Sequence, residues 1–465
     1  RGGITVKEKK LFDSITDIDD QLIEEAKESK VARFKMKIFL AVVASILVII
    51  SISLLLSRDK EVNHYAKPIL EVVYPKAYAF DDYDNRRKLR EENPVDDSTI
   101  GTVNDFAYKT SSFILTKAEK NTNYSPLSLY YALALATSGA KNETEMELLN
   151  LLGSFDTQVL SKQCGNLYRL LYKDNEIGKI KIANSIWLDN EVNGQPVVFN
   201  DTFVENAAKN FYASSHSVDF SNKETGNAMG NWISENTKGT LEPTIETNPQ
   251  QILSIINTVY FYDQWINRFN KSNTIEDSFY LLNGGEVKID FMNQTFGSTG
   301  FSKGINLTRA SLGLKNGGEM VFILPDEGIS PYDLVSSSEK MKEIFEEGEN
   351  FYGEVVWKIP KFNFNSQLKL KDILKALNVK LAFEPSADFT GMADQMAYIS
   401  EIQQQTYISI DEVGVEASAF TQINYHGAAP PEDRADMILD RPFIYGITTS
   451  NGSLLFIGVC MNPAE

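Results

Sequence analysis

Residues 407–431, YISIDEVGVEASAFTQINYHGAAPP, combine the features of a β-strand with those of an exposed loop. After Gly414, alternate residues divide into a small, mostly apolar face and a mostly polar face. The first face consists of Val415, Ala417, Ala419, Thr421 and Ile423, and the second of Glu416, Ser418, Phe420, Gln422 and Asn424. The small residues and prolines at 426–431 are typical of an extended loop, because proline cannot donate to a sheet. The same residues therefore suit two states, loop and strand.

The residues around this segment carry a family resemblance. Tyr407–Ile410 is a run of strand-forming residues, and the four residues 411–414 are enough to reverse the chain. The acidic, glycine-containing turn followed by small residues resembles the reactive-centre loop of the serpin family. Downstream, Asp440-Arg441-Pro442-Phe443-Ile444 and Leu455-Phe456-Ile457-Gly458 resemble the closing strands of that family. The resemblance extends from about Val103 to Glu465.

This resemblance implies an α+β fold with a large central mixed β-sheet, smaller sheets, eight or nine helices and an exposed reactive-centre loop. The implied activity is suicide inhibition, in which a serine protease attacks the loop and forms an acyl-enzyme through its own serine. The cleaved loop would then insert into the large sheet and trap the protease, so the chain would not itself be an enzyme. The alternative is a non-inhibitory serpin that acts as a binding or carrier module, which the small hinge residues disfavour.

The resemblance also implies a place for the reactive bond, which in the family usually follows the hinge glycine by about fourteen residues. From Gly414 this count leads to Ala428-Ala429, and small residues on both sides predict an elastase-like or subtilisin-like target. Cleavage after Tyr425 or His426 would instead indicate a chymotrypsin-like protease. Gly427 and Pro430 complete the residues expected to flank the bond. The hinge is expected to consist of Glu412, Gly414, Val415, Glu416, Ala417, Ser418, Ala419 and Thr421.

Four residues outside the loop are expected to control insertion. Ser125 precedes Pro126, a pair that predicts a helix start with Ser125 as its N-cap. The resemblance places Ser125 and Ser128 in the shutter, the zone where strands of the large sheet separate. Asn257 lies in an apolar strand and must find hydrogen-bond partners there; by resemblance it is the shutter asparagine. Trp265 would mark the upper end of the sheet, called the breach, where insertion begins.

Two departures from the family pattern bear on the insertion step. Val415 stands where the family prefers Thr or Ser, and Gln404 stands where it often has a shutter histidine. Phe420 is bulky for a hinge, although it falls on the outer face. Because insertion would bury the first inward hinge residue, we expect a charge at Val415 to abolish inhibition.

Residues 38–56, IFLAVVASILVIISISLLL, form an uncharged run that would span roughly 28 Å as a helix. We predict a transmembrane helix here, between a cytoplasmic tail at 1–37 and an extracellular tether at 57–98, with the serpin domain at 99–465. Basic residues upstream of the run place the N-terminus in the cytoplasm. The predicted localisation is therefore a single-pass cell-membrane protein. A cleaved signal peptide is the competing interpretation, disfavoured by the long preceding region.

The sequence also indicates which chemistries to exclude. With 45 Lys+Arg against 63 Asp+Glu the formal net charge is −18, which argues against nucleic acid as a partner. The chain has three histidines and lacks H-E-x-x-H, G-x-S-x-G and P-loop motifs, so neither an enzyme nor a metal or cofactor site is expected. Its two cysteines, Cys164 and Cys460, do not make a disulfide framework. The expected partners are a serine protease and, through the N-terminal helix, a membrane, with the chain itself monomeric.

Overall fold

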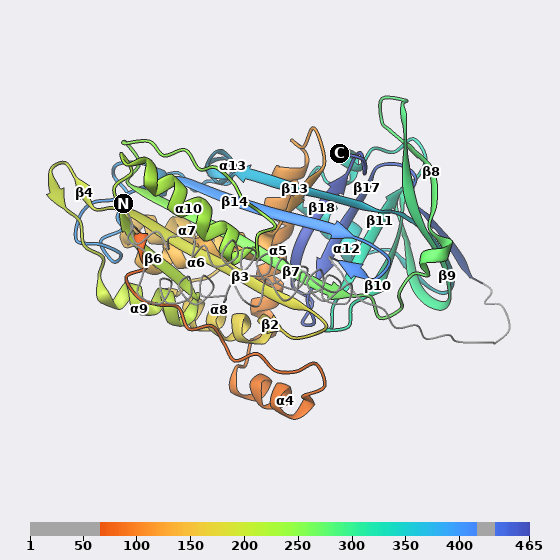
Figure 1. Ribbon diagram of the computed structural model, residues 1–465, viewed down its shortest axis with the longest axis horizontal. Helices are drawn as coiled ribbons and strands as arrows, with labels where there is room; N and C mark the ends of the chain where they lie inside the picture. Colours follow the sequence, from red (N-terminus) through yellow and green to blue (C-terminus); the bar gives the residue numbers. More distant parts are fainter. Residues whose placement is uncertain (1–65, 416–432) are drawn as a thin grey trace, which may run out of the picture. The chain divides into compact units, whose positions relative to one another are not determined.

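A computed structural model describes residues 66–415 and 433–465 of the chain (Figure 1). These residues belong to one compact unit that extends to Glu465. The predicted tail at 1–37, the predicted transmembrane helix at 38–56 and loop residues 416–432 lie outside the described residues. Within 66–415 and 433–465, no helix has the length and apolar character that crossing a membrane requires.

The sheet that carries the hinge has seven strands. Its order is β13-β14-β15-β7-β3-β2, and β6 pairs with the lower part of β3. The sheet is mixed, because β14–β7 and β3–β6 are parallel while the other pairs are antiparallel. Its strands are β2 (Lys173–Asp174), β3 (Lys179–Asp189), β6 (Ala213–Val218), β7 (Leu253–Gln264), β13 (Phe362–Lys369), β14 (Ile399–Ile410) and β15 (Gly414–Val415).

A second, nine-stranded sheet holds the chain that returns from the loop. Its order is β1-β18-β17-β11-β10-β9-β12-β16, with β8 paired to β9. A two-stranded sheet joins β4 (Glu191–Val192) to β5 (Gln195–Pro196). The nine strands are β1 (Thr122–Tyr124), β8 (Ile275–Tyr280), β9 (Glu286–Gly304), β10 (Leu307–Gly313), β11 (Glu319–Pro325), β12 (Glu349–Pro360), β16 (Arg434–Ile438), β17 (Phe443–Thr448) and β18 (Leu454–Cys460). The Asn283-Gly284-Gly285 turn joins β8 to β9, with Gly284 in the left-handed region at φ 83°.

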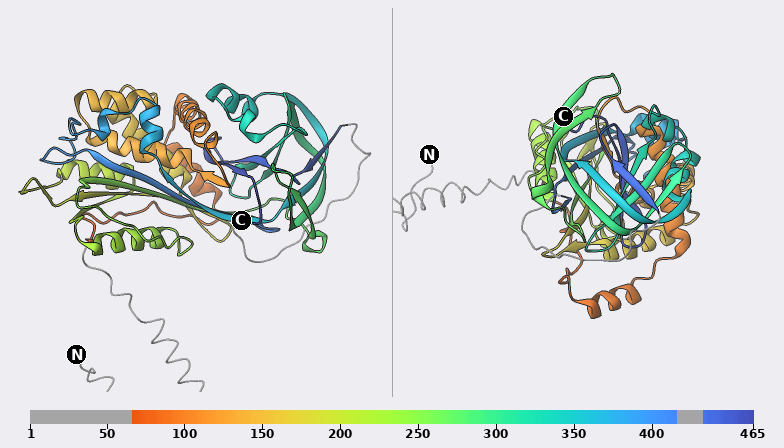
Figure 2. Two further views of the ribbon diagram at one scale, coloured as in Figure 1. Left: turned by 90° about the horizontal axis from the view of Figure 1, so that it is seen from above. Right: turned by 90° about the vertical axis from the view of Figure 1, so that its right-hand side faces the viewer.

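Helices cover both faces of the seven-stranded sheet (Figure 2). On one face α6 (Pro126–Gly139) is apolar on all sides and therefore buried, with only Ser138 partly exposed. On the other face α10 (Lys223–Asn236) packs Met229 and Ile233 against Trp187 of β3 and Ile256 of β7. The remaining helices are α4 (Tyr83–Glu92), α5 (Asp97–Leu115), α7 (Asn142–Leu152), α8 (Thr157–Leu171), α9 (Asp201–Asn210), α11 (Pro331–Leu334), α12 (Ser338–Glu346) and α13 (Lys371–Ala376). The architecture expected from the sequence is confirmed, with ten α-helices in the described residues where eight or nine were predicted.

Candidate functional site

The junction between β14 and β7 is the centre of the candidate site. The two strands pair in parallel from Ile399↔Leu253 to Gln405↔Thr258. Beyond this pairing, toward their C-terminal ends, the two strands separate. There β15 lies between them, with Val415 opposite Asp263 of β7 and Ile410 of β14. Within the described residues, 406–409 pair only with β13 and 259–262 only with β3. Two strand edges therefore face each other next to β15, an arrangement that can template a further strand.

The turn that leads into the hinge has the reversal expected from its sequence. Asp411 N donates to Gly414 O at 3.0 Å, and Asp411 Oδ1 accepts from the backbone N–H of Val413 at 2.8 Å. Gly414 lies directly against β7, where a Cβ would come 2.2 Å from the carbonyl oxygen of Asp263. Only glycine fits this close approach, so the hinge glycine is required by packing against the neighbouring strand.

Trp265 holds the same turn in place through two hydrogen bonds. Its indole is fully buried, and Nε1 donates to Asp411 O at 2.9 Å while its backbone N donates to Val413 O at 3.0 Å. Trp265 directly follows Gln264, the last residue of β7, and its role in loop entry stays a prediction. Removing the indole would leave the Asp411 carbonyl without this donor.

Glu412 fixes the turn to the opposite side of the junction. Its buried carboxylate accepts from Thr274 Oγ1 at 2.7 Å and lies 3.3 Å from Lys361 Nζ, just after β12. Burial acts to raise the pKa of Glu412, but the Thr274 hydroxyl, a backbone donor and the Lys361 charge together hold that pKa below its usual value. The carboxylate therefore stays ionised and holds the start of the hinge in place.

Asp263 is a buried carboxyl at the breach that the sequence did not single out. It is 1% exposed and accepts from Gln264 N at 2.8 Å and from Asn316 N and Nδ2, both at 3.2 Å. Asn316 follows β10, so this contact joins the two sheets at the point where β15 begins. Burial raises the pKa of Asp263 to about 6, against the opposing effect of these donors.

We expect Asp263→Asn to stabilise the protein increasingly as the pH rises. The fold favours the neutral carboxyl, so the stability from that raised pKa is present at low pH and is lost as the pH rises through about 6. An amide cannot ionise, and the advantage of the variant in unfolding free energy should grow by about 1.4 kcal/mol from pH 5 to pH 8. Urea denaturation of both proteins at the two pH values measures this. An advantage that does not change with pH would contradict it.

Asn257 is the centre of a buried polar row across the sheet. Its register partners are Asn184 on β3 and Gln404 on β14. Its Nδ2 donates to Asn184 Oδ1 at 2.7 Å and to Ser128 O at 3.1 Å. Its Oδ1 accepts from Ser128 Oγ and, at 3.2 Å, from Gln404 Nε2. The hydrogen-bonding groups of this buried amide are thus all satisfied, as the sequence argument required.

Gln404 connects the β14 side of the junction to the start of α6. Its Nε2 donates to Ser125 O and its Oε1 accepts from Ser125 N, both at 2.8 Å. Ser125 is the N-cap residue of α6, but its side chain does not cap the helix; Oγ instead donates to Leu455 O of β18 at 2.6 Å. A neutral glutamine therefore supplies the donor and the acceptor needed here without titrating.

The structure brings together the described residues expected from the sequence, in two groups on the same junction. Ser125, Ser128 and Asn257 lie in the polar row, whereas Glu412, Gly414, Val415 and Trp265 lie at the breach. The remaining predicted residues lie outside the described residues: Glu416, Ala417, Ser418, Ala419, Thr421, Tyr425, His426, Gly427, Ala428, Ala429 and Pro430. Sequence reasoning missed Asp263, Asn184 and Lys361. Asp263 and Asn184 had a usable signal, a polar residue within an apolar strand.

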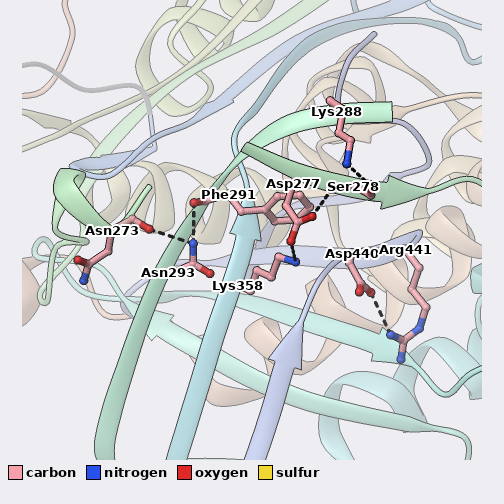
Figure 3. Close-up of polar contacts among 9 residues, drawn as sticks. All are labelled: Asn273, Asp277, Ser278, Lys288, Phe291, Asn293, Lys358, Asp440 and Arg441. Atoms are coloured by element: carbon pink, nitrogen blue, oxygen red, sulfur yellow. Dashed lines mark hydrogen bonds and ion pairs between the residues drawn. The ribbon is translucent and has the colours of Figure 1, made fainter. Parts of the chain in front are cut away.

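Beyond the loop, the chain returns as β16 beside β12, where polar contacts brace β8, β9 and β12 (Figure 3). Lys358 Nζ lies 2.7 Å from Asp277 Oδ2, and Asn293 Nδ2 donates to Asn273 O and to Phe291 O, both at 2.9 Å. Asp277 is half exposed, so solvent screens this ion pair and it contributes little to stability. The contacts hold the strands in register rather than forming a chemical site.

Comparison with known proteins gives one consistent result. The family model Serpin (serine protease inhibitor) matches residues 101–463. Serpin-Z2B of Triticum aestivum is 29% identical over 383 residues, which cover 77% of this chain and 94% of that protein. The native structure of tengpin, a thermophilic serpin, aligns with a TM-score of 0.73 and 25% identity over 85% of this chain and 99% of its own. A highly specific serpin of the insect Tenebrio molitor aligns with a TM-score of 0.69 and 27% identity over 79% and 98% of the two chains.

The predicted localisation, a single-pass protein of the cell membrane, is wrong in light of these findings. The similar sequences include plant serpins such as Serpin-Z2B, and the alignment already covers 94% of that protein, so nothing in it supports an added N-terminal anchor. Across residues 66–415 and 433–465, none of the helices could cross a membrane. The apolar run at 38–56 met the length criterion for a spanning helix, but length and apolarity alone do not establish one.

Proposed function

We propose that this chain, which belongs to the serpin family of protease inhibitors and is not an enzyme, traps serine proteases irreversibly by inserting its cleaved loop into the seven-stranded sheet. The observation that carries the proposal is the position of β15. Val415 is already paired on both sides, with Ile410 of β14 and Asp263 of β7, and Gly414 is paired with β7, between two strands that separate above Gln405. An incoming strand would extend β15 between β14 and β7. It would replace the parallel pairing of β14 with β7 by two antiparallel pairings, one with each of these strands.

The register of β15 supports a defined end point for insertion. Continuing the pairing of Val415 with Asp263 would bring Tyr425 opposite Leu253, the first residue of β7. Continuing its pairing with Ile410 would bring Tyr425 opposite Ser400, at the start of β14. The two registers agree to within one residue, because Leu253 pairs with Ile399 and the β14–β7 register shifts between Ile399 and Glu401. The loop up to Tyr425 therefore matches the length of the junction.

This length favours Ala428-Ala429 as the reactive bond. Ala428 lies three residues past Tyr425, which places an acylated residue roughly 10 Å beyond the last sheet pair. In the β7 register it reaches Gln250, which lines a polar groove together with Lys369, Lys371 and Glu401. A bond after Tyr425 would instead leave the attached protease at the last pair of the sheet. We therefore propose small-residue specificity, of the elastase-like or subtilisin-like kind.

The same register gives Thr421 a role in the inserted state. It would arrive opposite Asn257 on β7 and Gln404 on β14, the two residues whose mutual hydrogen bond insertion must break. Directly opposed residues share a face of the sheet, so the Thr421 hydroxyl would point toward the polar row. Of the inward hinge residues Val415, Ala417, Ala419 and Thr421, only Thr421 is polar. We propose that its hydroxyl replaces the hydrogen bond lost between Asn257 and Gln404.

Thr421→Val is expected to destabilise the cleaved, inserted protein and to leave the intact protein unchanged. The substitution keeps the shape of the side chain but leaves buried polar groups unsatisfied after insertion, at a cost of about 1–3 kcal/mol. Denaturant unfolding of intact and loop-cleaved forms measures the difference, and Gln422→Ala on the outer face serves as the control. Equal effects on both forms would show that Thr421 does not reach the polar row.

The inhibitory function itself is tested by mixing the full chain with an elastase-type serine protease. We expect a covalent band at the summed mass on a denaturing gel, and a released C-terminal peptide that begins at Ala429. Complete cleavage without such a band, at every protease tested, would contradict inhibition and favour the carrier alternative. A covalent band with a peptide that begins at His426 or Gly427 would keep inhibition and overturn the proposed specificity.

A further inference from the structure

Residues 66–96 form a strap that runs along the outer side of the seven-stranded sheet (Figure 1). At its start, the Ala66 carbonyl accepts from His216 Nδ1 and Ile69 N donates to Ser215 O, both at 2.8 Å. His216 and Ser215 belong to β6, and His216 stacks on Trp187 with ring centroids 4.0 Å apart. The strap is thus fixed to an outer strand of the sheet through its backbone.

Tyr74, in the middle of the strap, contacts elements on both faces of the sheet. Its ring stacks with Tyr172 at the end of α8 and with Tyr212 just after α9, with centroids 5.9 and 6.2 Å away. Lys181 Nζ of β3 lies 4.1 Å from the centre of the ring. Its hydroxyl donates to Asn236 Oδ1 at the end of α10, at 3.4 Å. One side chain therefore links β3 and α10 with the ends of α8 and α9.

The far end of the strap is hydrogen-bonded to α8. Asn166 Nδ2 donates to the Pro94 carbonyl at 2.7 Å, and Gln163 Nε2 donates to Asp96 Oδ2, also at 2.7 Å. Between Tyr74 and this attachment lies α4, which buries none of its residues. The strap is consequently attached at three points: to β6 at its start, through Tyr74 further along, and to α8 at its end.

These attachments lie on two groups of elements that insertion must separate. Opening the β14–β7 junction requires β7 to move with β3, to which it pairs from Lys179 to Leu188. β6 and α10 must follow, because β6 pairs with β3 and α10 packs on Trp187 and Ile256. α8 instead packs on α6 in the main core, through Leu160, Leu167 and Leu171. The strap therefore connects the elements that move with β7 to α8, which stays with α6.

We propose that the strap is a brake on loop insertion, which holds β3, β6 and α10 against α8. This inference rests on the proposed inhibitory function. It concerns a part of the chain that precedes residues 101–463, the segment matched by the family model. The brake slows insertion in the uncleaved protein, where premature insertion would inactivate the inhibitor.

The test compares full-length variants for spontaneous conversion into the heat-stable, inserted form during incubation without protease. We expect Tyr74→Ala to convert about tenfold faster than wild type, the size of effect expected when two ring stacks and a cation–π contact are lost. Tyr74→Phe keeps the stacks and should convert at nearly the wild-type rate. Lys181→Met should convert faster than wild type but more slowly than Tyr74→Ala. Tyr83→Ala, with its ring 69% exposed on α4, is the matched control and should behave as wild type.

Two results would contradict the brake alone, and a third would contradict the proposed inhibitory function as well. If Tyr74→Ala unfolds at a lower temperature but inserts no faster than wild type, the strap only stabilises the fold and the proposal is overturned. If Tyr83→Ala accelerates conversion as much as Tyr74→Ala, the effect is not specific to the bridge and the proposal is likewise overturned. If wild type fails to gain heat stability even after its loop is cleaved, the proposed function fails together with the brake.

Discussion

Val415→Glu is expected to abolish the covalent protease complex and to leave the chain as a substrate that is merely cleaved. Val415 is 2% exposed and lies directly opposite Asp263, whose carboxyl is also buried. Opposed side chains share one face of the sheet, so the glutamate would place a second carboxylate beside the first. Burying an unpaired charge next to a like charge costs several kcal/mol, and hydrolysis of the acyl-enzyme would then outpace insertion. Arginine at this position also carries a charge and should abolish the complex.

The measurement is the ratio of covalent complex to cleaved inhibitor after complete reaction with an elastase-type protease. Val415→Thr is the matched control, because it has the shape of valine and its hydroxyl can donate to the Asp263 carboxyl. We expect the threonine variant to form at least as much complex as wild type. Undiminished complex formation by Val415→Glu would show that insertion does not depend on an uncharged side chain beside Asp263.

Asn257→Ala is expected to lower the unfolding free energy of the intact protein by roughly 3–4 kcal/mol. The amide is 1% exposed and makes hydrogen bonds to Ser128, Asn184 and Gln404. Alanine would leave these buried partners without donors or acceptors and would open a small cavity beneath the sheet. Because the row spans the junction, we also expect the intact variant to insert its loop prematurely.

Chemical denaturation of the intact variant measures the stability loss, and storage at moderate temperature followed by an inhibition assay measures premature insertion. Asn227→Ala, on the exposed side of α10, removes the same side chain without touching a buried partner and should be neutral. A loss for Asn257→Ala no larger than that for Asn227→Ala would mean that the polar row does not stabilise the closed junction.

The sequence was informative at positions where only one physical requirement explains the residue type. Gly414 could be assigned because only glycine tolerates the approach to β7, and Asn257 because an amide within an apolar strand must be satisfied. The alternating small residues after Gly414 predicted a strand-competent hinge, and the structure begins that strand at Gly414–Val415. Local pattern and resemblance were thus sufficient for the fold, and they singled out several residues that lie at the β14–β7 junction.

What the sequence could not provide were contacts between distant segments. Asp263 stands beside the hinge only because β15 pairs there, and its partner Asn316 comes from the other sheet. Lys361 reaches Glu412 across the junction, at a sequence separation that no periodicity reveals. The attachments of the strap lie in the stretch predicted as a tether, where mixed charge and weak periodicity carry no sign that Tyr74 stacks with Tyr172 and Tyr212.

Thermal unfolding before and after cleavage within residues 416–428 by a non-target protease shows whether the β14–β7 junction accepts the cleaved loop as a new strand. Up to Tyr425 the incoming strand would gain two ladders, worth on the order of 10 kcal/mol before ordering entropy. We therefore predict a large rise in the unfolding temperature of the cleaved protein, together with loss of inhibition. An unfolding temperature that is unchanged or lower after cleavage would contradict insertion of the loop into this junction.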